Sequence, residues 1–253
     1  MRDLLLGRRP KDFDIGTSAH PYEVKKLFRN CWIIGRRFRL AHVRFGSKTI
    51  EVATFRRHVS AEEIAAAELA AAEHAGSAGT PPAADGLHAH DRLIHRDNTF
   101  GTPEEDAFRR DFTINALFYD PASQEIWDYH GGVANLRRKQ LRMIGEPVQR
   151  YREDPVRMLR AVRFATKLGF ALDQATLATI PRLRHLLDDI APARLFDEML
   201  KLFQGGMGQQ SFEALRHHGL FHCLFPLTDE LLDSPEGDFA LTLISAALRS
   251  TDA

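Results

Sequence analysis

The hydrophobic pattern of the chain changes at Pro147. Before this residue, short runs rich in β-branched and aromatic residues are separated by turn residues, which is typical of strands. After it, apolar residues recur at the spacing of one helix face. A sheet-forming part followed by a helical part predicts the α+β class, with a mixed sheet and its helices first and an all-α region second.

The individual elements are expected where these patterns meet cap and turn residues. Strands are expected at 31–34, 38–45, 49–55, 116–119, 126–129 and 141–144, and helices at 2–6, 21–29, 154–168, 173–187, 193–204, 209–218 and 238–249. A further helix begins after Thr102, because proline follows at the first helical position and Glu105 stands three residues after the threonine. Residues 61–90 hold twelve alanines, and we expect a mobile, largely disordered insertion over 60–92.

Composition limits the class of protein. Of the 253 residues, 44% are hydrophobic and 27% are charged, as in ordinary globular proteins. We expect no membrane span, because no apolar run is long enough, and the first residues lack the layout of a secretory signal. Cys31 and Cys223 are expected to be free thiols. These features predict a cytoplasmic protein.

The net charge of zero hides an uneven distribution along the chain. Residues 24–57 contain ten Lys or Arg against one acid, a local charge of +9, and residues 136–167 contain ten against three, a charge of +7. Residues 186–253 contain four against eleven, a charge of −7. Basic segments of this size favour a polyanionic partner, although some of these side chains solvate helix faces.

Two acids, Asp12 and Asp14, stand in an expected strand. Side chains two apart on a strand project to one face, and neighbouring carboxylates repel each other unless a cation lies between them. Mg²⁺ suits such a site, because it takes carboxylate and phosphate oxygens together. Phe13 and Ile15 would then face a core. A polar turn after Pro10 is the alternative, and it is the usual meaning of an isolated Asp-x-Asp.

A third carboxylate, Glu51, is expected in the strand at 49–55. Alternation places it on the opposite face from Ile50 and Val52. It is either a neighbour of the acid pair or a solvated residue of an edge strand.

Three further segments accompany the acid pair: RRDFTINAL at 109–117, EDPVRMLRAVRF at 153–164 and IIGRRFRLAHV at 33–43. Together the four motifs resemble those of the bacterial class of template-independent RNA nucleotidyltransferases, which holds the poly(A) polymerases and the CCA-adding tRNA nucleotidyltransferases. The segment at 33–43 is similar to the one that marks the poly(A) polymerases. The resemblance covers nearly the whole chain outside 60–92. It implies a polymerase-β-like nucleotidyltransferase head at 1–144, a helical neck at 145–205 and the start of a helical body at 206–253.

The resemblance also implies an activity, which is transfer of AMP from ATP to the 3′ ends of RNA. Asp12 and Asp14 would hold two Mg²⁺ ions, and Asp111 would be the third required acid, unless it is an acid paired with Arg109 or Arg110. Arg110 and Asn115 would contact sugar and triphosphate.

The segment at 153–164 implies the residues that read the base. Glu153, Asp154 and Arg157 would match the edge of the nucleobase from one helix face, whereas the alternative for Glu153 and Arg157 is an intrahelical ion pair. Val156, Leu159, Val162 and Phe164 are expected to form the buried stripe. Arg160 and Arg163 would contact triphosphate or RNA, or solvate the helix.

Two other functions stay open: a CCA-adding tRNA nucleotidyltransferase with the same catalytic residues, and a catalytically inactive RNA-binding remnant. The resembled family has a strand and a Gly-Gly turn before the position of Arg2, with amides that hold the triphosphate, and it continues beyond the last helix. Neither segment is in this sequence. We therefore expect this chain to be a fragment that binds Mg²⁺-ATP more weakly than an N-terminally extended version.

Overall fold

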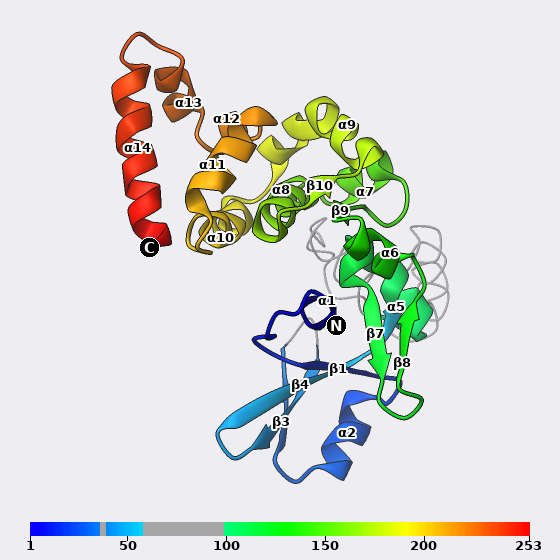
Figure 1. The fold of residues 1–253 in the computed structure, drawn as a ribbon. Helices are drawn as coiled ribbons and strands as arrows, with labels where there is room; N and C mark the ends of the chain where they lie inside the picture. Colours follow the sequence, from blue (N-terminus) through cyan, green and yellow to red (C-terminus); the bar gives the residue numbers. More distant parts are fainter. Residues whose placement is uncertain (36–38, 58–98) are drawn as a thin grey trace, which may run out of the picture. The chain divides into compact units, whose positions relative to one another are not determined.

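The computed structural model describes residues 1–35, 39–57 and 99–253, with helices and strands labelled in Figure 1. The chain divides into two compact units. The first, here the head unit, comprises Met1, Asp3–Arg110 and Phe118–Tyr129. The second, here the helical unit, comprises Arg2, Asp111–Leu117 and His130–Ala253. The predicted insertion at 60–92 lies outside the described residues.

The first part of the chain forms strands and short helices close to the predicted positions. In order they are α1 (Arg2–Leu5), β1 (Asp14–Thr17), α2 (Pro21–Leu27), β2 (Cys31–Ile34), β3 (Leu40–Phe45), β4 (Lys48–Thr54), β5 (Arg56–Arg57), β6 (Thr99–Phe100), α5 (Pro103–Arg109), β7 (Leu117–Asp120) and β8 (Glu125–Asp128).

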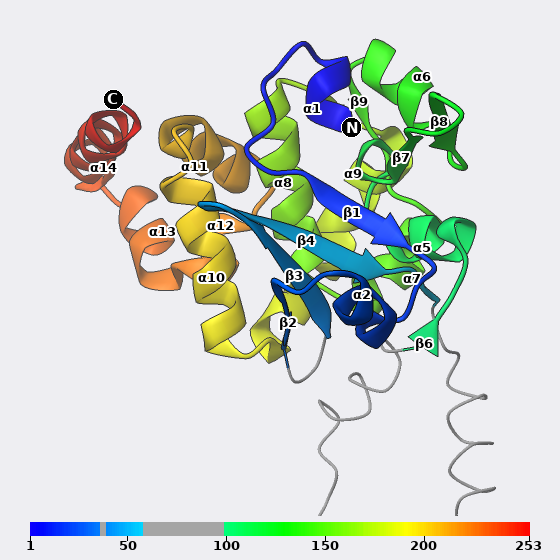
Figure 2. The ribbon, with the colours of Figure 1, turned by 90° about the horizontal axis from the view of Figure 1, so that it is seen from below.

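Four of these strands form a mixed sheet in the order β1-β4-β3-β2 (Figure 2). β1 runs parallel to β4, and the other two pairs are antiparallel. One face of the sheet packs on α2 through a small apolar core of Val24, Cys31, Ala41, Val43 and Val52. The mixed sheet and the helices that follow confirm the predicted α+β class.

The prediction that Phe13 and Ile15 are buried is wrong. Their exposed fractions are 64% and 46%. Ile15 is the register partner of the buried Val52, so it does lie on the core-facing side of the sheet. It stays exposed because β1 is an edge strand that pairs with β4 alone in this sheet. Phe13 precedes the strand altogether, as does Asp12.

The predicted helix start at Thr102 is confirmed. The Thr102 hydroxyl accepts a hydrogen bond from the Glu105 amide at 3.2 Å, and the Glu105 carboxylate accepts one from the Thr102 amide at 2.7 Å. The two reciprocal bonds satisfy backbone donors that a helix terminus otherwise leaves without partners.

Removal of this cap gives a first testable expectation. Thr102→Ala should lower the free energy of unfolding of the head unit by about 1 kcal/mol, because a cap acceptor is lost. Urea titration followed by tryptophan fluorescence measures it, since both tryptophans belong to the head unit. Thr49→Ala, at an exposed position of β4, is the control and should change stability by less than about 0.5 kcal/mol. Equal effects of the two substitutions would contradict the role of the cap.

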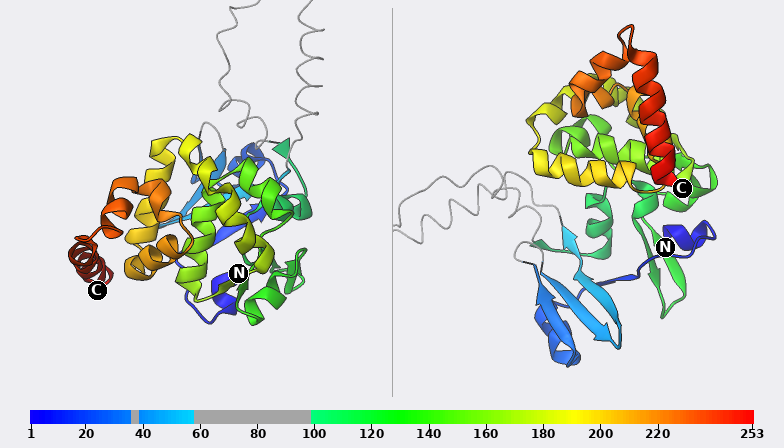
Figure 3. Two further views of the ribbon diagram at one scale, coloured as in Figure 1. Left: turned by 90° about the horizontal axis from the view of Figure 1, so that it is seen from above. Right: turned by 90° about the vertical axis from the view of Figure 1, so that its left-hand side faces the viewer.

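The second part of the chain is helical, as predicted, with one short pair of strands (Figure 3). Its elements are α6 (Gly132–Arg137), β9 (Gln140–Leu141), α7 (Pro147–Glu153), α8 (Val156–Leu168), β10 (Ala171–Leu172), α9 (Gln174–Leu183), α10 (Pro192–Phe203), α11 (Gly208–His217), α12 (Phe221–Leu224), α13 (Pro226–Leu232) and α14 (Gly237–Asp252), with 3-10 turns at Thr113–Asn115 and Arg184–Asp189.

Helix α8 is central to the helical unit. It packs against α7, α10 and α11, and α11 also packs against α14. The predicted buried stripe is confirmed, since Val156, Leu159, Val162 and Phe164 are all at most 9% exposed. Across the described ranges, none of the helices has the length and apolar composition needed to cross a membrane.

One prediction for this part is wrong. The helix expected at 154–168 does not include Asp154, which has extended backbone angles of φ −150° and ψ 93°. The cause is Pro155, whose ring disfavours helical geometry at the preceding residue. After the hairpin of β7 and β8, Gly131 takes the left-handed conformation (φ 72°), and α6 begins directly after it.

Candidate active site

Asp14 is the first residue of β1, Asp12 lies two residues before the strand, and both side chains are exposed. Neither carboxylate makes a hydrogen bond or ion pair with any other described residue. The strand that begins at Asp14 is held in place by a close contact, because the Phe55 ring packs on Gly16, where an added Cβ would lie 2.5 Å from the ring. Two neighbouring carboxylates repel each other, and because no protein group compensates their charge, a bound cation would stabilise them.

Glu51 extends this acidic region across the sheet. It is the register partner of Asp14 on one side and of His42 on the other. The His42 Nε2 lies 3.6 Å from a Glu51 carboxylate oxygen. The interpretation of Glu51 as an edge residue is wrong, because β4 lies inside the sheet, between β1 and β3. Glu51 is therefore beside Asp14, on the face opposite the core residue Val52.

Asp111 is the most strongly held of the predicted site residues. It is 9% exposed and accepts hydrogen bonds from the Phe112 amide at 2.8 Å and the Asn115 amide group at 3.0 Å. The Arg160 guanidinium donates two more from Nε and Nη2, at 2.8 and 2.5 Å. Burial alone would raise the pKa of Asp111, but Arg160 and these hydrogen bonds outweigh it and lower the pKa below the usual 3.8.

The expected alternative for Asp111, a pair with Arg109 or Arg110, is wrong. Both arginines instead bind Asp106, which is 3% exposed and also accepts a bond from the Arg56 amide. Arg110 donates to Asp106 from Nε and Nη2, at 3.1 and 3.0 Å. Its guanidinium carbon lies 4.9 Å from the centre of the Phe118 ring.

Both the nitrogen and the oxygen of the Asn115 side-chain amide make hydrogen bonds. The nitrogen donates to Asp111, and the oxygen accepts from Arg2 Nη1 at 2.7 Å. The Arg2 guanidinium also lies over the Phe164 ring, 5.2 Å from its centre. Asn115 thus links Asp111 to a basic side chain near the start of the sequence.

Glu153, Asp154 and Arg157 cluster although they do not share a helix. Glu153 ends α7, Asp154 follows it, and Arg157 belongs to α8. The Glu153 carboxylate accepts from Arg150 at 2.8 Å and from Arg157 Nη1 at 3.1 Å, so the predicted pair forms across the helix junction. Asp154 accepts instead from Arg194 Nη2 of α10.

Two of these partners were missed from the sequence. For Arg160 the sequence indicates contact with triphosphate or RNA, or solvation of the helix, and it indicates no role for Arg150. Arg150 is 5% exposed, and its spacing of three from Glu153 was a usable signal. Nothing local pairs Arg160 with Asp111, because 49 residues separate them.

The predicted site residues fall into two sets. Asp12, Asp14, Glu51 and Arg110 belong to the head unit, and Asp111, Asn115, Glu153, Asp154 and Arg157 belong to the helical unit. Within the described part of the chain, no three His, Cys, Asp or Glu side chains gather closely enough to hold a metal ion by themselves.

Comparison with known protein families gives two matches. Residues 1–142 match the model of the poly A polymerase head domain, and residues 169–232 match the model of a probable RNA- and SrmB-binding site of polymerase A. The first match covers more than half of the chain.

Curated relatives agree with these models. Poly(A) polymerase I of Salmonella typhimurium is 49% identical over all 253 residues, and that of Haemophilus influenzae is 46% identical. The chain spans about half the length of these relatives, 50% and 52%. A CCA-adding enzyme of Bacillus velezensis is 33% identical over 220 residues, which is 87% of this chain and 48% of that enzyme.

The solved structures support the same fold. The CCA-adding enzyme of Bacillus stearothermophilus in complex with CTP matches 87% of this chain and 46% of its own, with a TM-score of 0.66 and 34% identity. A tRNA nucleotidyltransferase in complex with a primer tRNA and an incoming ATP analog gives a TM-score of 0.64 at 26% identity, over 87% of this chain and 56% of its own. The predicted nucleotidyltransferase head is thereby confirmed, and the chain belongs to the family of the poly A polymerase head domain.

Proposed function

We propose that this chain carries the site that transfers AMP from ATP to the 3′ hydroxyl of RNA. The observation that carries the proposal is the pair of exposed carboxylates of the head, Asp12 just before β1 and Asp14 at its first residue, which have no partner among the described residues. Poly(A) polymerase activity is favoured over CCA addition because the whole chain is 46–49% identical to the poly(A) polymerases but 33–35% identical to the CCA-adding enzymes.

The acid pair fits Mg²⁺ as the cofactor. Mg²⁺ usually takes one or two protein carboxylates and completes its coordination with water and substrate phosphates, so a cage of three protein ligands is not required. Asp12 and Asp14 would hold the ions, and Glu51 lies beside Asp14 in the register. When bound, two such ions neutralise charge on the attacking and leaving oxygens of the in-line displacement.

The side chains of the helical unit would orient the bound nucleotide. Asp111 is held as a carboxylate by Arg160, and it in turn fixes the Asn115 amide. A fixed amide presents a donor and an acceptor, which suits a ribose hydroxyl. Arg110, held by Asp106 in the head unit, would supply positive charge for the triphosphate.

Arg157 is suited to reading the base. Both of its hydrogen bonds, to the Arg150 carbonyl at 2.8 Å and to Glu153, use Nη1. Within the described residues, Nε and Nη2 make no hydrogen bond and remain as donors for the acceptor atoms of a nucleobase. The two existing bonds fix the direction of the guanidinium, which lowers the entropy lost on binding.

Substitution of Arg157 tests this role. Arg157→Ala should reduce the preference for ATP over CTP by at least about tenfold, because a base acceptor in the bound state loses its donor. The ratio of kcat/KM for the two nucleotides measures the effect. Arg152→Ala, on the exposed side of α7, is the matched control and should keep the ratio of the unmodified chain. An unchanged ratio in Arg157→Ala, with only a slower rate, would assign Arg157 to helix packing.

Primer extension tests the proposed function as a whole. A labelled RNA oligonucleotide and a tRNA without its CCA end are each incubated with the chain, Mg²⁺ and one nucleotide at a time. Successive additions of A to the oligonucleotide, with little use of CTP, are expected. Addition of CTP to the tRNA, followed by one A, would instead identify a CCA-adding enzyme, and no addition at all would favour an inactive RNA-binding remnant.

A further inference from the structure

One row of side chains crosses the whole four-stranded sheet of the head unit. Residues that pair across neighbouring strands place their side chains on the same face of a sheet. In strand order from β2 to β1, the row consists of Trp32, His42, Glu51 and Asp14. The core residue Val52 faces the other side. Three strand spacings of about 4.8 Å separate the two ends of the row by about 14 Å. Trp32 therefore shares an open sheet face with one of the two acids of the proposed transfer site.

The Trp32 ring is unusually accessible. It is 52% exposed, although tryptophan is highly buried on average. It makes no aromatic or cation contact with any described residue. Ile34, two residues further along β2, projects to the same face and is 50% exposed. An exposed ring with an apolar neighbour on a sheet face is a surface on which bases of a single strand stack.

A cation lies beside this ring on the same face. Arg44 follows His42 by two residues on β3, which makes it a diagonal neighbour of Trp32. The Arg44 Nε donates to the Gly46 carbonyl at 2.9 Å, and this bond fixes the direction of the guanidinium. Its Nη atoms make no hydrogen bond with the described residues and remain as donors for phosphate oxygens. The two side chains thus supply the stacking and the charge that hold single-stranded nucleic acid.

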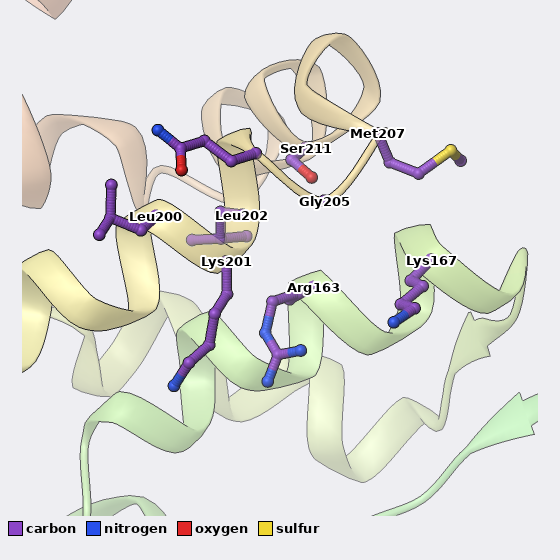
Figure 4. Close-up of a pocket in the computed structure, with 9 residues that line it drawn as sticks. Arg163, Lys167, Leu200, Lys201, Leu202, Gly205, Met207 and Ser211 are labelled. Atoms are coloured by element: carbon purple, nitrogen blue, oxygen red, sulfur yellow. The ribbon is translucent and has the colours of Figure 1, made fainter. Parts of the chain in front are cut away.

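The pocket of about 350 Å³ in the helical unit lacks this combination (Figure 4). It has a cationic lining, and its Arg163 and Lys201 both donate hydrogen bonds to the buried Glu198. Among the described residues that line the pocket, none is aromatic, so it offers no ring on which a nucleobase could stack. The open face of the head sheet does offer such a ring.

We propose that Trp32 stacks on a base of the RNA strand a few nucleotides from its reacting 3′ end, and that Arg44 contacts the adjoining phosphate. The length of the row, about 14 Å, corresponds to about four nucleotides at the 3.4 Å rise of a stacked strand. A strand with its 3′ end at Asp14 can therefore reach Trp32 along one sheet face. The proposal rests on the proposed function for the identity of the strand, since the base of a free ATP molecule offers the same stacking surface.

Tryptophan fluorescence reports on this contact without any catalytic step. The chain has two tryptophans, Trp32 and Trp127, so in a Trp127→Phe background the emission comes from Trp32 alone. Titration with a short oligoadenylate RNA should quench this emission, because a stacked base lies directly against the indole. The quenching should weaken with added salt in parallel with RNA binding.

Fluorescence anisotropy with a labelled oligoadenylate RNA measures the affinity. Trp32→Ala should weaken binding about fivefold to tenfold with an unchanged salt slope, because it removes one stacked base and no charge. Trp32→Phe keeps a ring and should restore most of this loss. Arg44→Ala should make the slope of log affinity against log salt less steep by about 0.7, the value for one lost phosphate contact on a single strand.

Phe45→Ala is the matched control. Phe45 is 54% exposed and follows the core residue Val43 by two positions, so it lies on the opposite face of the same sheet. This variant should bind RNA as the unmodified chain does. An equal loss of affinity in Phe45→Ala, or unchanged affinity in Trp32→Ala, would overturn the contact at Trp32.

The fluorescence titration separates this proposal from the proposed function. RNA that binds and is extended without quenching Trp32 would overturn the stacking contact alone. Quenching by Mg²⁺-ATP but not by RNA would assign the ring to a free nucleotide, and the proposal would fail. Quenching by RNA without AMP transfer would support the contact while the proposed function fails, and absence of RNA binding by the unmodified chain would overturn both.

Discussion

Asp14→Asn is expected to reduce AMP incorporation by at least about a hundredfold while the fold is kept. A neutral amide is a poorer ligand than a carboxylate for a hard divalent ion. Loss of charge stabilisation at a transferring phosphoryl group lowers the reaction rate by a factor of this size. The fold should be unaffected, because the Asp14 carboxylate is exposed and bonds to no other described residue. Its removal also relieves repulsion with Asp12, so thermal stability should be unchanged or slightly raised.

Incorporation of labelled AMP measures the activity, and a thermal melt of the same samples measures the stability. Asp12→Asn should behave as Asp14→Asn does. Glu125→Gln, an exposed acid of β8 in the same unit, is the control and should keep full activity. Near-normal turnover in either aspartate variant, or a loss of activity that follows a loss of structure, would contradict the assignment of the pair.

Arg160→Ala is expected to lower the free energy of unfolding of the helical unit by about 3 kcal/mol. The substitution leaves the Asp111 carboxylate buried without its main counter-charge, and breaking one side of a buried ion pair costs about this much. Circular dichroism at 222 nm during urea unfolding reports on this helix-rich unit. Arg249→Ala removes an exposed arginine of the same unit and should change stability by less than about 0.5 kcal/mol.

The pH dependence of stability gives a second measure of this pair. The pKa of Asp111 is lower in the folded protein than in the unfolded chain, so the stability contributed by its ionisation is fully present above about pH 3.9 and is lost as the pH falls through the folded pKa. Arg160→Ala should reduce the loss of stability on acidification in this range. An acid-unfolding profile identical to that of the unmodified chain would show that Arg160 does not hold Asp111 ionised.

Local patterns predicted much of the head unit. The strands at 31–34, 38–45 and 49–55 appear as β2, β3 and β4, and Thr102 and Glu105 form the expected reciprocal cap. Each of these features depends on residues within one element or turn. The register that brings Glu51 beside Asp14 could not be read in this way, because it depends on which strands become neighbours.

The remaining differences have similar causes. Pro155 breaks the helix expected at 154–168, and this effect of proline on its predecessor could have been applied to the sequence directly. The partners of Asp111 and of Asp154 lie 49 and 40 residues away, respectively, so only the packing of α8 and α10 selects them. The exposure of Ile15 likewise depends on the position of β1 at the sheet edge.

Transfer of label from ATP to RNA tests the central claim most directly. The chain is incubated with Mg²⁺, an RNA oligonucleotide and ATP labelled at either the α or the γ phosphate, with an otherwise identical RNA that ends in a 3′-deoxynucleotide as control. Nucleotidyl transfer by the site at Asp12 and Asp14 predicts label in the RNA from α-labelled ATP alone, and only when the 3′ hydroxyl is present. Label from the γ phosphate, transfer to the 3′-deoxy RNA, or no transfer of the α label to the RNA with a 3′ hydroxyl would contradict it.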